Sequence, residues 1–203
     1  MSAYSFDHQR TVSDIPQSFS AKIGEVELQL TSHPQLFSPR RVDAGTLAML
    51  KCVTFEPHDK VLDLGCGCGV VGVYAARLLA VENVFLTDSD PIAVEVAKAN
   101  AAANGVAGVS VTLSNGFHDF HETGFTRILS NPPYHTDFSV AKHFIMKGFN
   151  RLQIGGELIF VTKRDKWYRN KLQAIFGGAK SQQVDGYVVT SATKRRDTYA
   201  KKR

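Results

Sequence analysis

Apolar and polar residues alternate between positions 19 and 30, and the alternation changes phase once. Apolar side chains stand at odd positions in the first half and at even positions in the second half, with Gly24-Glu25 between them. A period of two indicates a strand with one buried face, and a two-residue interruption with glycine indicates a tight turn. The pattern therefore predicts an antiparallel β-hairpin. After a loop with two prolines, Asp43 is expected to cap a helix that begins near Ala44.

From residue 60 on, short apolar runs alternate with longer runs of helical periodicity. Strands are predicted in residues 60–64, 83–88, 109–115, 126–131 and 157–163. Helices are predicted in residues 70–80, 91–104, 140–152 and 167–176, the third of them ending near Gly155-Gly156. Two last runs, residues 181–185 and 187–194, flank Gly186 and predict an antiparallel pair. Repeated strand–helix units predict an α/β fold: a Rossmann-like, doubly wound, mostly parallel seven-stranded sheet with helices on both faces, plus the N-terminal β-hairpin.

Length and composition indicate one domain with short extensions. The 203 residues are 43% apolar, which is enough for a sizeable core. We divide the chain into an N-terminal extension with the hairpin (1–36), an α/β domain (37–193) and a basic C-terminal tail (194–203). No apolar run approaches the roughly 20 residues that cross a membrane, and the first ten residues lack the pattern of a signal peptide. Three cysteines do not make a disulfide framework, so a cytoplasmic protein without a membrane partner is expected.

The excess positive charge lies in the tail. Residues 194–203 hold six Lys/Arg and one Asp, whereas the rest of the chain holds equal numbers of acidic and basic side chains. Such a block can attract the phosphates of a nucleic acid, or it can be a solvated segment that aids solubility.

The first predicted strand of the sheet runs into a glycine-rich turn, DLGCGCGVVG. Glycines at 65, 67 and 69 let the backbone turn sharply and approach a ligand closely. Their spacing differs from the G-x-G-x-x-G of dinucleotide sites, and Asp63 before the turn would repel a phosphate. The next strand ends in Asp88, whose carboxylate can bind a ribose diol. These features together predict a nucleoside cofactor with no phosphate and a cationic end, a description that S-adenosylmethionine meets.

The fourth predicted strand of the sheet ends in SNPPYH. Because the carboxyl ends of parallel strands meet at one edge of a sheet, Asn131 is expected to face the glycine-rich turn. The Asn131 side-chain oxygen and the Pro132 carbonyl can accept the N–H groups of a planar amine, and Tyr134 can stack on it. An amine on a nucleic-acid base would have to be presented outside the stack, with Phe37 and Phe138 as further stacking faces or as core residues. A strand-end turn without chemistry is the other interpretation of this motif.

Several segments together resemble a known family. VLDLGCGCGVVG and LTDSDPIAVEVAKANAAANG are similar to the first two motifs of the class I S-adenosylmethionine-dependent methyltransferases. LFSPRRVDAGTLAML, SNPPYH and GGELIFV, in this order, resemble the small-domain methyltransferases typified by guanine-N2 methyltransferase C of 16S ribosomal RNA. By this resemblance, the catalytic residues are Asn131, Pro132, Pro133 and Tyr134. The resemblance also implies a cofactor site made of Asp43, Gly45, Thr46, Asp63, Gly65, Cys66, Gly67, Gly69, Asp88, Ser89, Ser114, Asn115 and Asn131.

The resemblance implies methyl transfer from S-adenosylmethionine to an exocyclic amine, with guanine N2 in small-subunit ribosomal RNA as the expected target. The partner would be ribosomal RNA or the small ribosomal subunit, contacted by Tyr134, Arg40 and Arg41. Lys163, Arg164, Lys166 and Arg169 follow the fifth predicted strand at the same edge of the sheet, and they are either an RNA-facing patch, with Lys163 and Arg164 as its contacts, or a solvated helix start. Adenine-N6 methylation of nucleic acid, glutamine-N5 methylation of protein and an inactive RNA-binding module are the alternatives. Typical family members carry a further N-terminal domain, whereas about 35 residues precede LFSPRR here.

A metal site is not expected from the sequence. Cys66, Cys68, His118 and His121 are residue types that bind zinc, but the two cysteines lie inside the glycine-rich turn and lack the usual two-residue spacing. We expect them to pack as small apolar residues.

Overall fold

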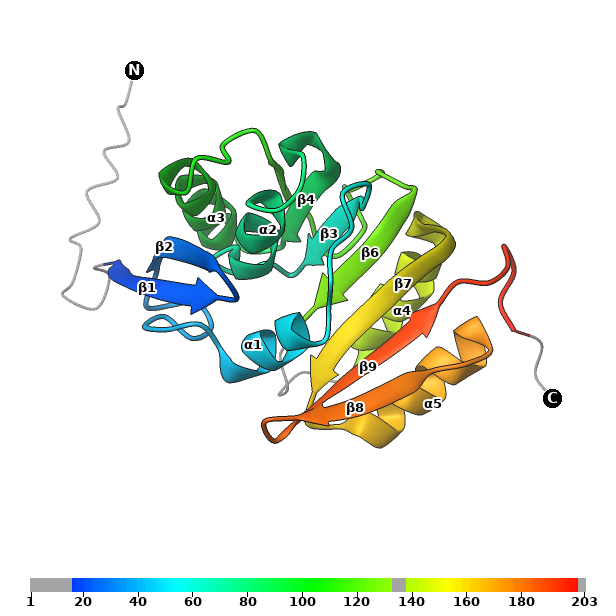
Figure 1. The fold of residues 1–203 in the computed structure, drawn as a ribbon. Helices are drawn as coiled ribbons and strands as arrows, with labels where there is room; N and C mark the ends of the chain where they lie inside the picture. The colour runs from blue at the N-terminus through cyan, green and yellow to red at the C-terminus, as the bar shows by residue number, and fades with distance from the viewer. Residues whose placement is uncertain (1–15, 133–137, 201–203) are drawn as a thin grey trace, which may run out of the picture.

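The computed structural model describes residues 16–132 and 138–200, which form a two-stranded hairpin and one seven-stranded sheet between two layers of helices (Figure 1). The hairpin strands are β1 (Gln17–Ile23) and β2 (Val26–Ser32). The sheet strands are β3 (Val61–Leu64), β4 (Val84–Asp88), β5 (Ser110–Leu113), β6 (Phe125–Ser130), β7 (Leu152–Thr162), β8 (Lys180–Val184) and β9 (Tyr187–Thr193). The helices are α1 (Ala44–Lys51), α2 (Val70–Ala76), α3 (Pro91–Ala103), α4 (Phe138–Arg151) and α5 (Asp165–Phe176), with a short 3-10 turn at Val81–Asn83.

The strand order across the sheet is β5-β4-β3-β6-β7-β9-β8. The first five strands of this order are parallel, and β9 pairs antiparallel with both β7 and β8. From β3 the chain adds β4 and β5 on one side of the sheet and then β6 and the later strands on the other side. The carboxyl ends of β3 and β6 therefore lie next to each other at the point where the strand order reverses. The predicted fold class is therefore confirmed, including the hairpin and its turn at Gly24-Glu25.

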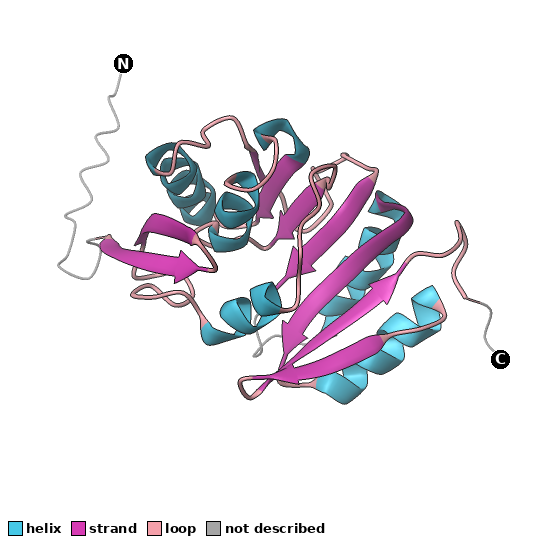
Figure 2. Ribbon diagram, viewed as in Figure 1, coloured by secondary structure: helices cyan, strands magenta, loops and turns pink. Residues whose placement is uncertain are grey.

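Two apolar clusters lie on the two faces of the sheet. On one face, apolar side chains of α1, α2, α3 and the hairpin pack against every second residue of the sheet strands. On the other face, α4 and α5 pack against the strand residues that point the opposite way. Figure 2 shows α4 and α5 together on one side of the sheet, with α1, α2 and α3 on the other. Because both faces are covered, the central strands are almost continuously apolar, as their sequences show.

The connection from β5 to β6 covers the sheet without a helix. Phe120 from this connection contacts Phe85 at 6.2 Å and Phe125 at 6.0 Å between ring centroids, and Phe117 belongs to the same cluster. Aromatic rings thus supply the apolar surface that a helix would otherwise provide.

Two predicted helix ends are wrong. The helix that was expected to end near Gly155-Gly156 ends at Arg151, and β7 begins at Leu152. An added Cβ at Gly156 would lie 2.6 Å from the Phe125 carbonyl oxygen, so this glycine serves close packing of β7 on β6. The second helix of the prediction also ends early, at Ala76.

None of the helices in the described ranges combines the length and the apolar character that crossing a bilayer requires.

Asn100 of α3 and Asn104, the C-cap residue of this helix, bind the free edge of β2. Asn100 accepts from the Thr31 N–H at 2.8 Å and donates to the Thr31 carbonyl at 2.8 Å, and Asn104 makes the same pair with Gln29 at 2.9 and 2.7 Å. Asn100 also donates to the Cys68 carbonyl in the glycine-rich turn at 2.7 Å. One buried amide therefore ties the hairpin, α3 and this turn together.

We expect Asn100→Ala to lower the free energy of unfolding by about 2–4 kcal/mol, because it leaves the backbone groups of Thr31 and Cys68 without their partner in a buried position. Urea unfolding followed by circular dichroism measures this change. Asn150→Ala, at an exposed position of α4, is the control and should change stability by less than about 0.5 kcal/mol. Equal effects of the two substitutions would contradict the structural role of Asn100.

Candidate active site

A cavity of about 400 Å³ opens at the carboxyl ends of β3, β4 and β6. Residues from the loop before α1, the glycine-rich turn and the ends of these strands form its wall. The predicted site residues in this wall are Arg41, Asp43, Thr46, Asp63, Gly65, Cys66, Gly67, Asp88, Ser89, Ser114, Asn115, Asn131 and Pro132. The structure thus brings the glycine-rich turn and Asn131 into one cavity.

Other predicted residues lie elsewhere. Gly45 and Gly69 are not in the cavity wall, and Arg40 is exposed beside it. Pro133 and Tyr134 lie outside the described residues. Phe37 lines the cavity with 60% of its surface exposed, as a stacking residue would. Phe138 stacks on Trp167, with 4.2 Å between ring centroids, so this ring already has a partner.

Hydrogen bonds from β4 hold the glycine-rich turn. Gly65 and Cys66 donate their N–H groups to the Thr87 carbonyl at 2.8 and 3.0 Å. Gly67 has a φ of +53°, and a Cβ placed on it would meet no atom within 4 Å. The turn therefore leaves open space beside Gly67 for a ligand.

The Asp88 carboxylate also holds the backbone of the glycine-rich turn, a role that was not predicted from the sequence. One of its carboxylate oxygens accepts from the Gly67 N–H at 2.8 Å, and the other accepts from the Asp90 N–H at 3.0 Å. Each carboxylate oxygen has two acceptor sites, so Asp88 can hold the turn and still bind a hydroxyl group of a ligand.

Asp63 is buried beneath the turn and accepts one hydrogen bond, from the Gly72 N–H at 2.9 Å. Burial raises the pKa of this carboxyl from 3.8 to about 7, the Gly72 N–H opposes this change, and the charge of Asp88 adds to it. A cation bound in the cavity would favour the charged form of Asp63.

Among the described residues, Asp43 and Thr46 accept hydrogen bonds from the side-chain amide of Asn131. Its Nδ2 donates to Asp43 Oδ1 at 2.8 Å and to Thr46 Oγ1 at 3.0 Å. A carboxylate can only accept, so the amide atom beside Asp43 is the nitrogen. These two bonds fix the plane of the amide and direct its Oδ1 away from α1.

The same oxygen of Asp43 caps α1. Asp43 Oδ1 accepts from the Gly45 and Thr46 N–H groups at 2.9 and 3.1 Å. Capping of α1 was predicted from the sequence, whereas the bond from Asp43 to Asn131, which lies 88 positions further along the chain, was not. Next to it, the Ser130 hydroxyl donates to the Leu64 carbonyl at 2.7 Å and joins the ends of β6 and β3.

The two cysteines of the turn pack as apolar residues. Cys66 and Cys68 are buried, and burial raises the pKa of Cys66 well above its ordinary value and that of Cys68 to about 11. Both thiols are therefore protonated at neutral pH. Within the described ranges, no group of three or more His, Cys, Asp or Glu side chains is arranged to hold a metal ion.

Part of the cavity wall was not predicted from the sequence. Gly116, Val140 and Phe144 line the cavity, and an added Cβ at Gly116 would lie 3.0 Å from Phe144 and His143. Helical periodicity marks Phe144 as buried, but it does not say that the ring reaches the end of β5. Gly116, directly after Ser114-Asn115, was the one residue in the sequence that could have indicated close packing of a side chain against the end of β5.

Comparison with known proteins agrees with this geometry. The family model of the methyltransferase small domain matches residues 27–191. The chain belongs to the methyltransferase small domain family. This result confirms the family predicted from the sequence motifs.

Two kinds of curated relative of this methyltransferase small domain are similar in sequence. Ribosomal RNA small subunit methyltransferase C of Pseudomonas putida is 30% identical over 190 residues, which cover 91% of this chain and 57% of the relative. Ribosomal RNA large subunit methyltransferase G of Klebsiella pneumoniae is 29% identical over 193 residues, which cover 91% of this chain and 51% of that protein. The chain therefore spans little more than half the length of these relatives.

Solved structures resemble the whole fold. The T. thermophilus 16S rRNA N2 methyltransferase RsmC, solved with AdoMet and guanosine, superposes with a TM-score of 0.81 and 27% identity, covering 92% of this chain and 52% of that one. A methyltransferase from Pyrococcus furiosus has a TM-score of 0.66 at 19% identity, covering 83% of this chain and 90% of its own, and shows the common fold.

The burial of Asp63 predicts a pH dependence of stability. Below pH 3.8 the carboxyl is protonated in both folded and unfolded chains. As the pH rises toward about 7, the unfolded chain ionises first, so the wild type loses stability that Asp63→Asn keeps. We expect the unfolding free energy of Asp63→Asn minus that of the wild type to increase between about pH 4 and 7 and to level off above. Urea unfolding across this range tests it, and a constant difference would contradict the prediction.

Proposed function

We propose that this protein transfers a methyl group from S-adenosylmethionine to an exocyclic amine of ribosomal RNA, with guanine N2 of the small-subunit RNA as the target. The observation that carries the proposal is the oriented amide of Asn131 in the same cavity as the glycine-rich turn. Similarity to ribosomal RNA methyltransferases over nine-tenths of the chain supports it.

The cavity wall suits S-adenosylmethionine. The charged residues that line it in the described ranges are Asp43, Asp63, Asp88 and Asp90 against Arg41, an acidic excess that favours a cation over a phosphate. Thr87 also lines the cavity, and its buried Oγ1 has no hydrogen-bond partner in the described part of the chain. A volume of about 400 Å³ lies within the usual range for sites of small ligands.

In this proposal, different residues of the cavity wall bind the ribose, the adenine and the amino-acid part of the cofactor. Asp88 would accept from the ribose hydroxyls, while Ser114, Asn115 and Phe144 would enclose the adenine. Asp63 and the space beside Gly67 would receive the amino-acid part. When bound, S-adenosylmethionine supplies an electrophilic methyl group on a sulfonium centre. The remaining proposed cofactor contacts are Thr46, Gly65, Cys66 and Ser89, whereas Gly45 and Gly69 lie outside the cavity wall and are not proposed as contacts.

The acceptor amine would lie beside Asn131 and Pro132. An exocyclic amine is planar and its lone pair is delocalised into the ring, so it is a weak nucleophile. The Asn131 oxygen and the Pro132 carbonyl would accept its two N–H groups and hold the nitrogen in line with the methyl group. The methyl–sulfur bond would break as the nitrogen–methyl bond forms, and the amine would release one proton to solvent after the transfer. Alignment of this kind contributes several kcal/mol to catalysis. Pro133 and Tyr134 complete the motif, with Tyr134 proposed to stack on the base, and Arg40, Arg41, Lys163 and Arg164 are the proposed contacts to RNA phosphates.

We expect Asn131→Ala to lower kcat by at least about 100-fold, because the amine loses an oriented acceptor, while the affinity for S-adenosylmethionine changes by less than about threefold. Thr46→Val removes one of the two bonds that orient Asn131 and should reduce kcat by about 5–20-fold. Methyl transfer from labelled cofactor to small-subunit RNA measures kcat, and calorimetry measures cofactor affinity. Activity of Asn131→Ala equal to the wild type would refute the role of Asn131.

Mass mapping of ribosomal RNA from cells lacking this protein tests the target. Loss of one N2-methylguanine from the small-subunit RNA is the expected result. Loss of a modification from the large-subunit RNA, or of an N6-methyladenine, would show that the RNA or the amine is different.

A further inference from the structure

The surface of α5 carries positive charge along one side. The helix buries Tyr168, Leu172, Ile175 and Phe176 against the sheet. Its exposed side holds Lys166, Arg169, Asn170 and Gln173, at the spacing that places residues on one helical face. The side of α5 that faces solvent is therefore basic and polar from its first turn to its last.

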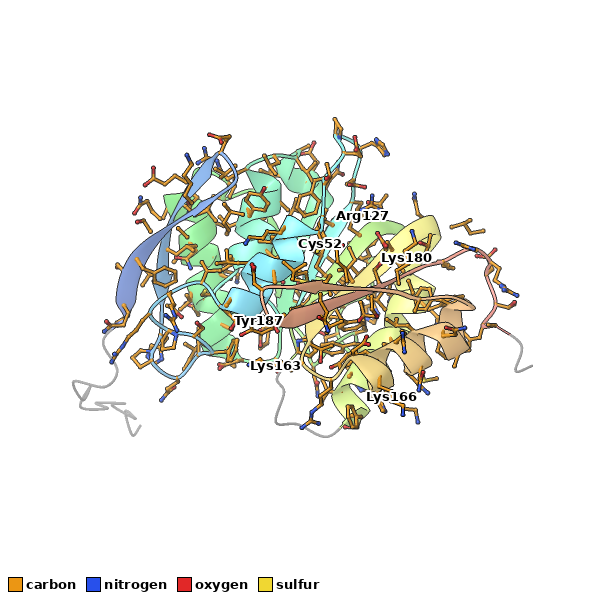
Figure 3. All side chains as sticks on the ribbon, turned by 60° about the horizontal axis from the view of Figure 1, so that its bottom comes forward. Cys52, Arg127, Lys163, Lys166, Lys180 and Tyr187 are labelled. Atoms are coloured by element: carbon orange, nitrogen blue, oxygen red, sulfur yellow. The ribbon has the colours of Figure 1, made fainter. Side chains whose placement is uncertain are left out.

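Further cations extend this stripe at both ends. Lys163 and Arg164 are exposed where β7 leaves the sheet, at the same edge as the cavity. Lys180 begins β8 at the opposite edge, where it lines a hollow of about 140 Å³ with Arg195, Ser191 and Glu157. Figure 3 shows Lys163, Lys166 and Lys180 on this part of the molecule. We call the set Lys163, Arg164, Lys166, Arg169, Lys180 and Arg195 the α5 track.

Within the described residues, no acidic side chain forms an ion pair with the α5 track, although Glu157 lines the same hollow as Lys180 and Arg195. Asp165 is the one acid between residues 163 and 180, and its Oδ1 accepts instead from Ser181 at 2.7 Å and Thr190 at 3.4 Å. Elsewhere, Lys22, Lys51, Lys60, Arg127 and Lys194 each lie within 4.0 Å of a carboxylate. No member of the α5 track takes part in an ion pair within residues 16–132 and 138–200.

Aromatic rings lie at the cavity end of the α5 track. Trp167 is half-buried and stacks on Phe138 with an angle of 17° between the rings, and the Arg164 guanidinium lies 5.3 Å from the Phe138 centroid. Lys163 lies 5.1 Å from the Tyr187 ring. Unpaired cations beside aromatic side chains are typical of surfaces that bind single-stranded nucleic acid.

We propose that the α5 track binds the phosphate backbone of the RNA strand that delivers its base to the cavity. The proposal rests on the proposed function for its RNA substrate. The strand would pass the β7–α5 junction, follow α5 for about 18 Å and reach Lys180 and Arg195 at the far edge of the sheet. Because the contacts are to phosphates, they position the strand and do not read its sequence.

Reversal of charge on α5 tests the proposal. In the double variant Lys166→Glu/Arg169→Glu, the affinity for deproteinised small-subunit ribosomal RNA should fall at least about 10-fold near 0.1 M salt. The slope of log K against log salt should become shallower by about 1.4, or about 0.7 for each lost phosphate contact. Both side chains are exposed and lack ion pairs, so the melting temperature and the affinity for S-adenosylmethionine should not change.

Lys22→Glu/Lys98→Glu is the control, since it reverses the same charge at exposed positions of β1 and α3. Lys22 also loses its ion pair with Glu25, but both of these side chains are exposed, so this loss should change stability little. It should leave RNA affinity within about twofold of the wild type. Equal losses in the two double variants would overturn the proposal, because total charge would then explain binding. Unchanged affinity in the α5 variant would also overturn it and would favour an acidic protein surface as the ligand of these cations.

Methyl-transfer kinetics separate this proposal from the proposed function. A KM for RNA raised at least about 10-fold in the α5 variant, with kcat within about twofold, supports both. Methyl transfer with an unchanged KM contradicts the α5 track alone. Weaker RNA binding by the α5 variant, without methyl transfer by the wild type, supports the track and contradicts the proposed function.

Discussion

One carboxylate oxygen organises the cavity. Asp43 Oδ1 accepts from two backbone N–H groups at the start of α1 and from the side chain of Asn131 after β6. The loop before α1 supplies part of the cavity wall, and β6 supplies the proposed acceptor for the substrate. This oxygen therefore fixes the proposed substrate-binding amide relative to the wall of the cofactor cavity. A helix cap and a site contact are made by the same atom, so neither can be changed alone.

Two further aspartates shape the floor of the cavity. Asp63 and Asp88 both accept hydrogen bonds from the glycine-rich turn or the helix after it, and both lie in the cavity wall. Burial of the Asp63 carboxylate beneath the turn costs stability, as its raised pKa indicates. The cost is offset when a cation enters the cavity, since the cation favours the charged form. The same side chains thus hold the turn and select the charge of the ligand.

The sequence was sufficient to predict the order of the strands and helices along the chain, because the central sheet strands are short apolar runs and many of the connections carry glycine or proline. It also located the cavity, since the carboxyl ends of parallel strands must share an edge. It failed at Gly155-Gly156, where Gly156 serves close strand packing and does not end a helix. Contacts between residues far apart in the sequence, such as Asn100 with β2 or Asp43 with Asn131, produce no local sequence pattern. They became visible only in the structure.

A double-mutant cycle between Asp43 and Asn131 tests the account most directly, with kcat for methyl transfer to ribosomal RNA as the readout. If Asp43 acts by orienting Asn131, Asp43→Ala will lower kcat nearly as much as Asn131→Ala, and the double variant will be little worse than either. Asp43→Asn, which keeps an acceptor for the cap and the amide, should restore much of the rate. Independent effects that multiply in the double variant would contradict the account.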